Sequence, residues 1–408
     1  MNQTSLNRSF TTWSLLGFAA PSIIMMVFMS LYTIVDGIFI SRFVGSNALS
    51  SLNIVYPMIS VVIAIATMFA TGGNAIVSRY LGQGQEKQAR EALTEFVVIG
   101  VLISTVFAAL VILFENPICR FLGANDELMA DCKAYLTISM LFAPACTLQT
   151  LFQSYFVTAS RPGLGLWLTV AAGILNALLD YVLIVPIPLG IAGAALATGF
   201  GQLLPAVVGL IFFAIPRKTL RFCRFSFRPW EIRDACINGS SEMIGQMATA
   251  ITTFLFNIIL MRLAGSDGVA AMTILFYGQF LFNAFYLGFA IGIAPVVGYQ
   301  YGAGNRKELR KIYRISFLFT VISSIAMTAA SIILATPIVS VFTKEPETFA
   351  LADAGFKIFA VNFLFSGVNL VSSGFFTALS NGKASAFSGR KKHLCTCTST
   401  SGLISSIR

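Results

Sequence analysis

Apolar runs of about 20 or more residues recur along the whole of this 408-residue chain. Each run is long enough to cross a hydrocarbon core of about 30 Å as an α-helix. A closed β-barrel can also satisfy its backbone in lipid, but short alternating segments encode it, not continuous runs. The composition agrees, because 56% of the residues are apolar and only 11% are charged, against about a quarter in average soluble domains. The sequence therefore predicts an all-α polytopic membrane protein.

We predict ten transmembrane spans, at roughly 13–40, 49–78, 92–114, 132–157, 164–186, 189–214, 235–262, 269–299, 313–335 and 354–380. The first run is too long for the apolar region of a signal peptide, and no small-residue cleavage pattern follows it. We therefore expect it to be a helix of the mature protein. Several runs exceed about 25 residues, which predicts helices that tilt or extend past the bilayer.

The net charge of +10 could suggest nucleic-acid binding, but the positions of the basic residues argue against it. With a cytoplasmic N-terminus, most of them fall in cytoplasmic segments, while the connections 115–131 and 344–353 lean acidic. This is the positive-inside distribution. We expect a multi-pass protein of the bacterial inner membrane whose partner is the lipid bilayer. The cytoplasmic basic residues would be Arg8, Arg79, Lys87, Arg90, Arg161, Arg217, Lys218, Arg221, Arg224, Arg228, Arg233, Arg306, Lys307, Arg310, Lys311 and Arg314.

One constant offset in residue number, which we call the repeat shift, aligns the two halves of the chain without a gap. The matches are Gly45-Ser46 with Gly265-Ser266, Gly82-Gln83-Gly84 with Gly302-Ala303-Gly304, Lys87 and Arg90 with Lys307 and Arg310, Pro117-Ile118 with Pro337-Ile338, and Phe156 and Ser160 with Phe376 and Ser380. One register kept over more than about 100 residues indicates a duplicated unit. An even number of spans in each unit gives both units the same orientation. We expect two tandem six-helix lobes that face each other across a central cavity.

This repeat divides the chain into an N-terminal lobe at 1–215, a basic cytoplasmic linker at 216–234 and a C-terminal lobe at 235–387. The C-terminal lobe would hold about four helices, because counterparts of the fifth and sixth spans are due near 384–406 and 409–433. The chain instead continues as a polar tail at 388–408, which contains the only histidine, His393. We interpret this tail as a truncated or frame-shifted end, and a regulatory tail is the alternative.

Three acidic residues stand out deep within the predicted spans, where an ionisable side chain is costly and usually functional. They are Asp36 in the first span, Asp180 in the fifth and Glu242 in the seventh. Asn176 precedes Asp180 by four residues, so both project from one helix face. A carboxylate in a partly dry site can bind and release a proton, or hold a small cation with amide and hydroxyl oxygens. The pattern favours ion-coupled transport, and hydration of each carboxylate at a helix end is the alternative.

Two polar stripes predict a water-filled cavity, although polar contacts between helices are the ordinary alternative. The seventh span carries Glu242, Gln246, Thr249, Thr253 and Asn257 on one face, and the tenth carries Asn362, Ser366, Asn369, Ser373 and Thr377. We assign Asn283 and Tyr286 of the eighth span to the same cavity. Aromatic faces of that span can hold lipophilic cations, although lipid-facing aromatic residues are commoner. These residues are Phe276, Tyr277, Phe280, Phe282, Phe285, Tyr286 and Phe289.

The sequence gives no support for an enzyme or an ATP-driven pump. It has no phosphate-binding loop, no ATP-binding domain and no catalytic triad outside the tail. The seven cysteines show no disulfide spacing, and His393, Cys395 and Cys397 are weak evidence for a metal site. We expect no cofactor beyond H⁺ or Na⁺ as the coupling ion.

These features resemble the multidrug and toxic compound extrusion (MATE) transporters, in particular their DinF-like branch. The resemblance covers about residues 10–385. It rests on Asp36 followed by Arg42-Phe-Val-Gly45-Ser-Asn-Ala-Leu, on Gly82-Gln-Gly84, on Asn176-Ala-Leu-Leu-Asp180 and on the twofold repeat.

The resemblance implies two lobes arranged as a V and an antiporter that exchanges H⁺ or Na⁺ for organic cations. It implies a cation site in the N-terminal lobe formed by Asp36, Asn176 and Asp180, with Tyr135 and Thr198 as further members. Pro21 is similar to the family's bend in the first helix. Glu242 is similar to an acidic position that some branches use in helix 7.

We therefore expect a secondary multidrug efflux antiporter for lipophilic cations, whose full activity an incomplete second lobe would put in doubt. Two alternatives remain. A lipid-linked-oligosaccharide flippase of the same superfamily would favour cationic residues in the lumen, whereas these spans carry acids. A truncated remnant or a membrane scaffold would not transport, and the reading frame near codon 388 would discriminate it.

Overall fold

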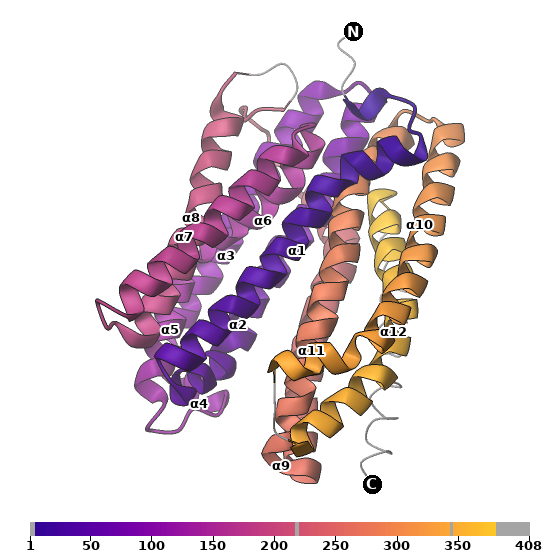
Figure 1. The fold of residues 1–408 in the computed structure, drawn as a ribbon. Coiled ribbons are helices and arrows are strands. Elements are labelled where there is room, and N and C mark those ends of the chain that lie inside the picture. Colours follow the sequence, from indigo (N-terminus) through magenta and orange to yellow (C-terminus); the bar gives the residue numbers. More distant parts are fainter. Residues whose placement is uncertain (1–4, 217–219, 343–345, 381–408) are drawn as a thin grey trace.

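The computed structural model describes residues 5–216, 220–342 and 346–380, apart from a few side chains inside helices. The described residues form helices joined by short connections (Figure 1). In chain order these are η1 (Ser5–Asn7), α1 (Thr12–Phe43), α2 (Ser46–Gly82), α3 (Glu86–Leu113), α4 (Glu115–Phe121), α5 (Met129–Leu141), α6 (Ala143–Thr158), α7 (Pro162–Ile184), α8 (Gly190–Ala214), α9 (Pro229–Gly302), α10 (Arg306–Ile333), α11 (Ala335–Phe342) and α12 (Pro346–Ala378). The predicted all-α fold is confirmed.

The helices gather into two groups, which we call the N-lobe (α1–α8) and the C-lobe (α9–α12). Figure 1 shows the N-lobe on the left and the C-lobe on the right, with α1 running between them. α1 packs against α7 in its own lobe and against α9 in the other, while α2 also packs against α9. The first two helices of the N-lobe therefore form its interface with the C-lobe.

α9 turns back on itself within its 74 residues. A straight helix of that length would extend on the order of 110 Å. Yet Gly239, near its start, touches the backbone of Met68, and Gly302, at its end, touches the backbone of Arg79. Both contacts are with α2 and lie only about three turns apart on it. The chain must reverse between them, as two successive spans require.

Eight described helices are long and apolar enough to cross a membrane, and the bent pair α5–α6 makes a ninth. They correspond to nine of the ten predicted spans. The remaining span, 235–262, lies in the first part of α9, where several side chains fall outside the described residues. It stays a prediction. The predicted tail at 388–408 also lies outside the described residues.

The span predicted as one helix at 132–157 is instead broken into α5 and α6, which meet at an angle of 51°. Pro144 explains the break. It lies in the first turn of α6 and has no backbone N–H to bond to the carbonyl of Met140, and its ring crowds that carbonyl. By contrast, α1 continues through Pro21, so the predicted bend at Pro21 stays a prediction.

Left-handed backbone conformations recur at positions related by the repeat shift. Gly84 has φ +74° and Gly304 has φ +69°, and each ends the turn before a helix. Ser160 has φ +61° and Ser380 has φ +57°, although non-glycine residues seldom adopt this conformation. Equivalent residues therefore end equivalent helices in the two lobes.

The contacts between the lobes repeat in the same way. A Cβ added to Gly82 would lie 2.0 Å from the carbonyl oxygen of Tyr299, and one added to Gly302 would lie 2.1 Å from that of Arg79. Applying the repeat shift to either contact produces the other. Small residues at such crossings let helix backbones approach closely. The N-lobe and C-lobe thus meet through a pseudo-twofold interface.

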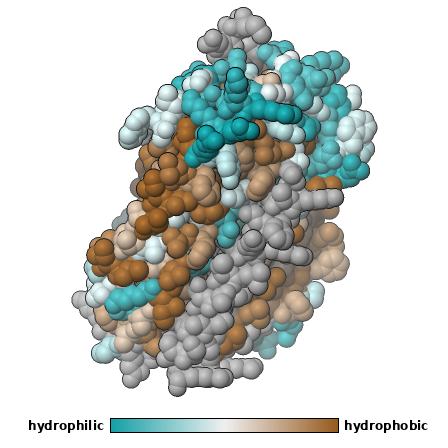
Figure 2. Space-filling view, turned by 90° about the vertical axis from the view of Figure 1, so that its right-hand side faces the viewer, coloured by the Kyte–Doolittle hydropathy of each residue, from teal (hydrophilic) through white to brown (hydrophobic). Residues whose placement is uncertain are grey.

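Charge divides the two ends of the molecule. The basic residues of 79–90, 221–233 and 306–314 lie at the end that also holds the N-terminus, and we call it the cationic end. Figure 2 shows hydrophilic residues gathered at this end and apolar residues on the sides below it. The acidic residues of 115–131, together with Asp353, lie at the opposite end, near α4 and α11. This arrangement agrees with the positive-inside pattern of the sequence.

Candidate ion-coupling site and inter-lobe pocket

Asp36 of α1 and Asp180 of α7 face each other inside the N-lobe. Their side chains interact through a hydrogen bond, and Oδ1 of each carboxyl is buried with no partner among the described residues. Asp180 is 2% exposed. A hydrogen bond between two carboxyl groups requires that at least one of them carries a proton. The pair can therefore exist in a protonated and a deprotonated form.

A glycine brings the two carboxyl groups together. A Cβ on Gly173 of α7 would lie 2.8 Å from the ring of Phe28 and 3.1 Å from that of Tyr32 on α1. The absence of a side chain at Gly173 lets the two helices pack closely. Asp36 follows Tyr32 by about one turn, and Asp180 follows Gly173 by about two turns. Both helices run away from the cationic end, so their carboxyls reach the same depth.

Asn176, Thr198 and Tyr135 complete this site. The Asn176 amide donates to the Thr198 hydroxyl at 3.5 Å, where Gly201 of α8 lies close to the Cβ of Asn176. Tyr135 of α5 is buried and lies close enough to Asp36 and Asp180 to interact with both electrostatically. The structure thus brings together the five residues expected for cation coupling, and their roles remain predictions. Carboxylate, amide and hydroxyl oxygens of this kind can hold a proton or a small cation.

The C-lobe reaches this site through Tyr277, whose role the sequence did not indicate beyond an aromatic stripe. A Cβ on Gly37 would lie 3.5 Å from the Tyr277 hydroxyl, and Tyr277 is within electrostatic reach of Asp36. Gly37 follows Asp36 directly in α1. A change in charge at Asp36 can therefore alter the electrostatic interaction with Tyr277 at the interface between the lobes.

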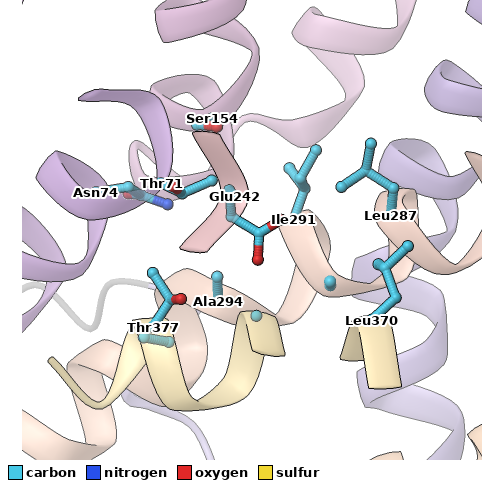
Figure 3. Close-up of a pocket in the computed structure, with 12 residues that line it drawn as sticks. Thr71, Asn74, Ser154, Glu242, Leu287, Ile291, Ala294, Leu370 and Thr377 are labelled. Atoms are coloured by element: carbon cyan, nitrogen blue, oxygen red, sulfur yellow. The ribbon is translucent and has the colours of Figure 1, made fainter. Parts of the chain in front are cut away.

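Glu242 of α9 lies in a separate small pocket between the lobes, nearer the cationic end. Its Oε1 accepts a hydrogen bond from the Ser373 hydroxyl at 2.8 Å. Figure 3 shows Glu242 between Thr71 and Asn74 of α2 and Thr377 of α12. The pocket has about 30 Å³ of free space. That is enough for one or two water molecules or a small cation, but not for a drug-sized molecule.

The other predicted cavity residues are divided between the interface and the interior of the C-lobe. Gln246 is half-buried and Thr249 is exposed, whereas the side chains of Thr253 and Asn257 lie outside the described residues. Asn369 is half-buried. Asn362 and Tyr286 are buried, and Asn362 and Asn283 each have a buried polar atom without a hydrogen-bond partner among the described residues.

The aromatic stripe of the eighth span is mostly core. Phe282 contacts Phe363 with ring centroids 4.5 Å apart, and Phe289 contacts Phe319 at 4.8 Å. Tyr286 packs beside Ser324 and Gly367, inside the C-lobe. These contacts favour a packing role for the stripe, with Tyr277 as the member that faces the N-lobe.

The MatE family model matches residues 21–182 and 243–388, which are most of the chain. The chain belongs to the MatE family. The resemblance drawn from Asp36, Asn176, Asp180 and the repeat is confirmed at the level of the family. MatE proteins are transporters, so this chain is a multi-pass membrane transporter and not an enzyme.

Relatives and solved structures of MatE proteins span nearly all of the chain. The multidrug export protein MepA of Staphylococcus haemolyticus strain JCSC1435 is 21% identical over 372 residues, which cover 91% of this chain and 82% of that protein. An outward-facing multidrug resistance MATE family transporter of the MOP superfamily has a TM-score of 0.88 at 19% identity, covering 95% of this chain and 87% of that one. The Vibrio cholerae MATE transporter VcmN has a TM-score of 0.84 at 21% identity, with the same coverages. These structures share the MatE fold.

Proposed function

We propose that this MatE protein is a secondary efflux antiporter that exchanges H⁺ or Na⁺ for lipophilic organic cations. The observation that carries the proposal is the Asp36–Asp180 carboxyl pair, held inside the N-lobe between membrane-spanning helices. The relative MepA, which is named a multidrug export protein, supports the choice of substrate class.

The ion would bind at the Asp36–Asp180 pair, with Asn176, Tyr135 and Thr198 around it. Burial makes a charged carboxyl pair costly, so uptake of a cation or a proton there lowers the free energy of the compact site. Tyr277 of the C-lobe lies beside Gly37. Ion binding can therefore be coupled to the packing of α1 against α9, which is the interface that must move.

The drug would bind between the lobes, around Glu242, Gln246, Thr249, Thr253, Asn257, Asn283, Tyr286, Asn362 and Asn369. The pocket at Glu242 is too small for a drug in the conformation described here, with about 30 Å³ of free space. The lobes must move apart at this level to admit one. Glu242 would then attract a cationic substrate, and a proton or cation would replace that substrate after release.

We also propose the membrane placement and the division of the chain. The cationic end would face the cytoplasm of a bacterial cell, with the protein in the inner membrane and the N-terminus inside. The lobes would correspond to residues 1–215 and 235–387, joined by the basic linker 216–234. Arg228 of this linker pairs with Glu91 of α3, which ties the linker to the N-lobe.

The residues that line the Glu242 pocket favour a drug antiporter over a flippase of the same superfamily. A flippase that handles a pyrophosphate group needs basic residues in its lumen. The described residues lining the Glu242 pocket include a carboxylate and no Lys or Arg.

Dye efflux from cells that express the full chain tests the proposal. Export of a lipophilic cationic dye should start when a proton or a sodium gradient is imposed separately, and the effective gradient identifies the coupling ion. Asp36→Asn and Asp180→Asn should each reduce export at least about a hundredfold, because an amide neither releases a proton nor carries the charge.

Asp126→Asn is the matched control, because it makes the same chemical change at a side chain that is 88% exposed. All three variants should reach the membrane in equal amounts. Undiminished export by both Asp36→Asn and Asp180→Asn would remove the coupling hypothesis. Absence of export by the unaltered chain under both gradients would favour a protein that does not transport.

A further inference from the structure

A larger cavity lies at the cationic end, on the C-lobe side of the interface and apart from the Asp36–Asp180 pair. Its volume is about 710 Å³. Arg79, at the end of α2, forms one side, and Arg306 and Arg310, in the first turns of α10, form another. The described residues that line it include no Asp or Glu. Three arginine residues thus line one space, and no acid lines it among the described residues.

These charges are not neutralised within the described part of the chain. No ion pair there involves Arg79, Arg306 or Arg310, and the Arg79 Nε is buried without a hydrogen-bond partner. The acid of the first turn of α10, Glu308, turns to the N-terminal segment instead. It accepts hydrogen bonds from the backbone N–H of Phe10 at 2.6 Å and from the Ser9 hydroxyl at 3.2 Å. The cavity therefore keeps a net positive charge.

At the equivalent positions of the N-lobe, an acid neutralises the charge of the arginine. There the α3 residues Glu86 and Arg90 form an ion pair at 2.8 Å, one helical turn apart. The repeat shift places Arg306 at the position of Glu86 and Arg310 at that of Arg90. The C-lobe has replaced an attractive pair by a repulsive one. Two cations at a helix N-terminus also oppose the helix dipole, so an anion bound there relieves both effects.

We propose that this cavity binds a phosphate group, supplied either by the headgroup of an anionic phospholipid or by a soluble phosphate. One guanidinium group can bind two phosphate oxygens at once, and three arginine residues line this cavity. The volume accommodates a headgroup, and Leu309 and Phe375 provide an apolar wall beside the arginines. The proposal concerns a site apart from ion coupling and does not depend on the proposed function.

Binding to the purified full chain tests the site, with two ligands measured separately. Inorganic phosphate is titrated in neutral detergent, and dioleoylphosphatidylglycerol is compared with dioleoylphosphatidylcholine in nanodiscs, by melting temperature and by native mass spectrometry. We expect the unaltered chain to bind at least one of the two phosphate sources. Binding of the lipid alone identifies a headgroup site, and binding of inorganic phosphate identifies a site for soluble anions.

Arg310→Gln and Arg306→Glu should weaken this binding about tenfold or more, since each removes charge-assisted hydrogen bonds. Arg306→Glu also recreates the Glu86–Arg90 pair of the N-lobe. Both side chains are exposed, so both variants should fold. Lys307→Gln is the matched control, because it removes one positive charge from the same turn but does not line the cavity. Equal binding by Arg306→Glu, Arg310→Gln and Lys307→Gln, or no phosphate-dependent binding by the unaltered chain, would overturn the proposal.

Discussion

In the N-lobe, Asp36 belongs to a buried carboxyl pair, whereas the repeat shift places Phe256 at the equivalent position of the C-lobe. The acid predicted within a span of the C-lobe is Glu242, and its equivalent in the N-lobe is Ser22, a buried hydroxyl. Ser22 and Asp36 lie roughly four turns apart on α1, on the order of 20 Å. The two lobes therefore hold their acids at different depths on one duplicated scaffold.

Side chains at two equivalent interior positions of the lobes also differ. Asn362 and Ser366 of α12 are buried with unpartnered polar atoms, whereas their N-lobe equivalents are Phe142 and Cys146. Buried polar atoms of this kind usually bind water. At these two positions the C-lobe thus places polar side chains where the N-lobe places an aromatic ring and a thiol. Duplication preserved the backbone, and the proposed function gives each lobe a separate chemical task.

A division of tasks predicts different outcomes when the two acids are neutralised. Glu242→Gln should reduce dye export about tenfold and change the range of exported cations, because Glu242 would contact the drug. Asp36→Asn should stop export of every substrate. Transport assays with several dyes of different shape distinguish the two results. Ser240→Ala, on the same helix, is the control, since its hydroxyl only bonds to the carbonyl of Ile237. If Glu242→Gln lowered export of all dyes as completely as Asp36→Asn, the division would be wrong.

The crossing glycines test how equivalent the two halves of the interface are. A Cβ on Gly72 would lie 2.0 Å from the carbonyl oxygen of Ala235, whereas one on the equivalent Gly292 would lie 2.9 Å from Ala19. Gly72→Ala should therefore destabilise the protein by about 1–3 kcal/mol, and Gly292→Ala by less.

The melting temperatures of the purified variants in detergent check this order. Gly17→Ala is the control, because no atom lies within 4 Å of a Cβ there and alanine favours the helix. Equal losses from Gly72→Ala and Gly292→Ala would show that the interface is more symmetric than the contacts indicate.

The spans and the two-lobe repeat could be predicted from the sequence, because hydropathy and the register of the repeat can be read directly from the order of residues. Acids and amides are rare inside spans, so the sequence could identify candidate site residues there, namely Asp36, Asn176 and Asp180. The break between α5 and α6 could not be predicted, since Pro144 is tolerated in many membrane helices and only packing decides whether one bends. The contact of Tyr277 with Gly37 and the Glu242–Ser373 hydrogen bond join distant parts of the chain, and no local pattern encodes such pairs.

A smaller test compares the ion pairs of the two lobes at the end of the molecule opposite the cationic end. In the N-lobe, Glu115 of α4 pairs with Lys133 at 2.9 Å and accepts a hydrogen bond from Thr137 at 2.6 Å. In the C-lobe, Asp353 stands at the position of Lys133, and pairs with Lys357 at 2.6 Å. Each lobe thus has an ion pair of one acid and one lysine near the start of an equivalent helix. In the N-lobe the acid lies on the preceding helix α4, whereas in the C-lobe both residues lie on α12.

The hydrogen bond from Thr137, helped by Lys133 and opposed by burial, holds the pKa of Glu115 below its usual value. A pKa that is lower in the folded state means that the charged carboxylate stabilises the fold above the ordinary pKa of about 4.3. This stabilisation is lost as the pH falls through the lowered pKa. Glu115→Gln should therefore cost less than about 1 kcal/mol at pH 7 and almost nothing near pH 3. Melting temperatures of the two proteins across this range check the effect, and a constant difference between them would show that Glu115 acts through packing and not through its charge.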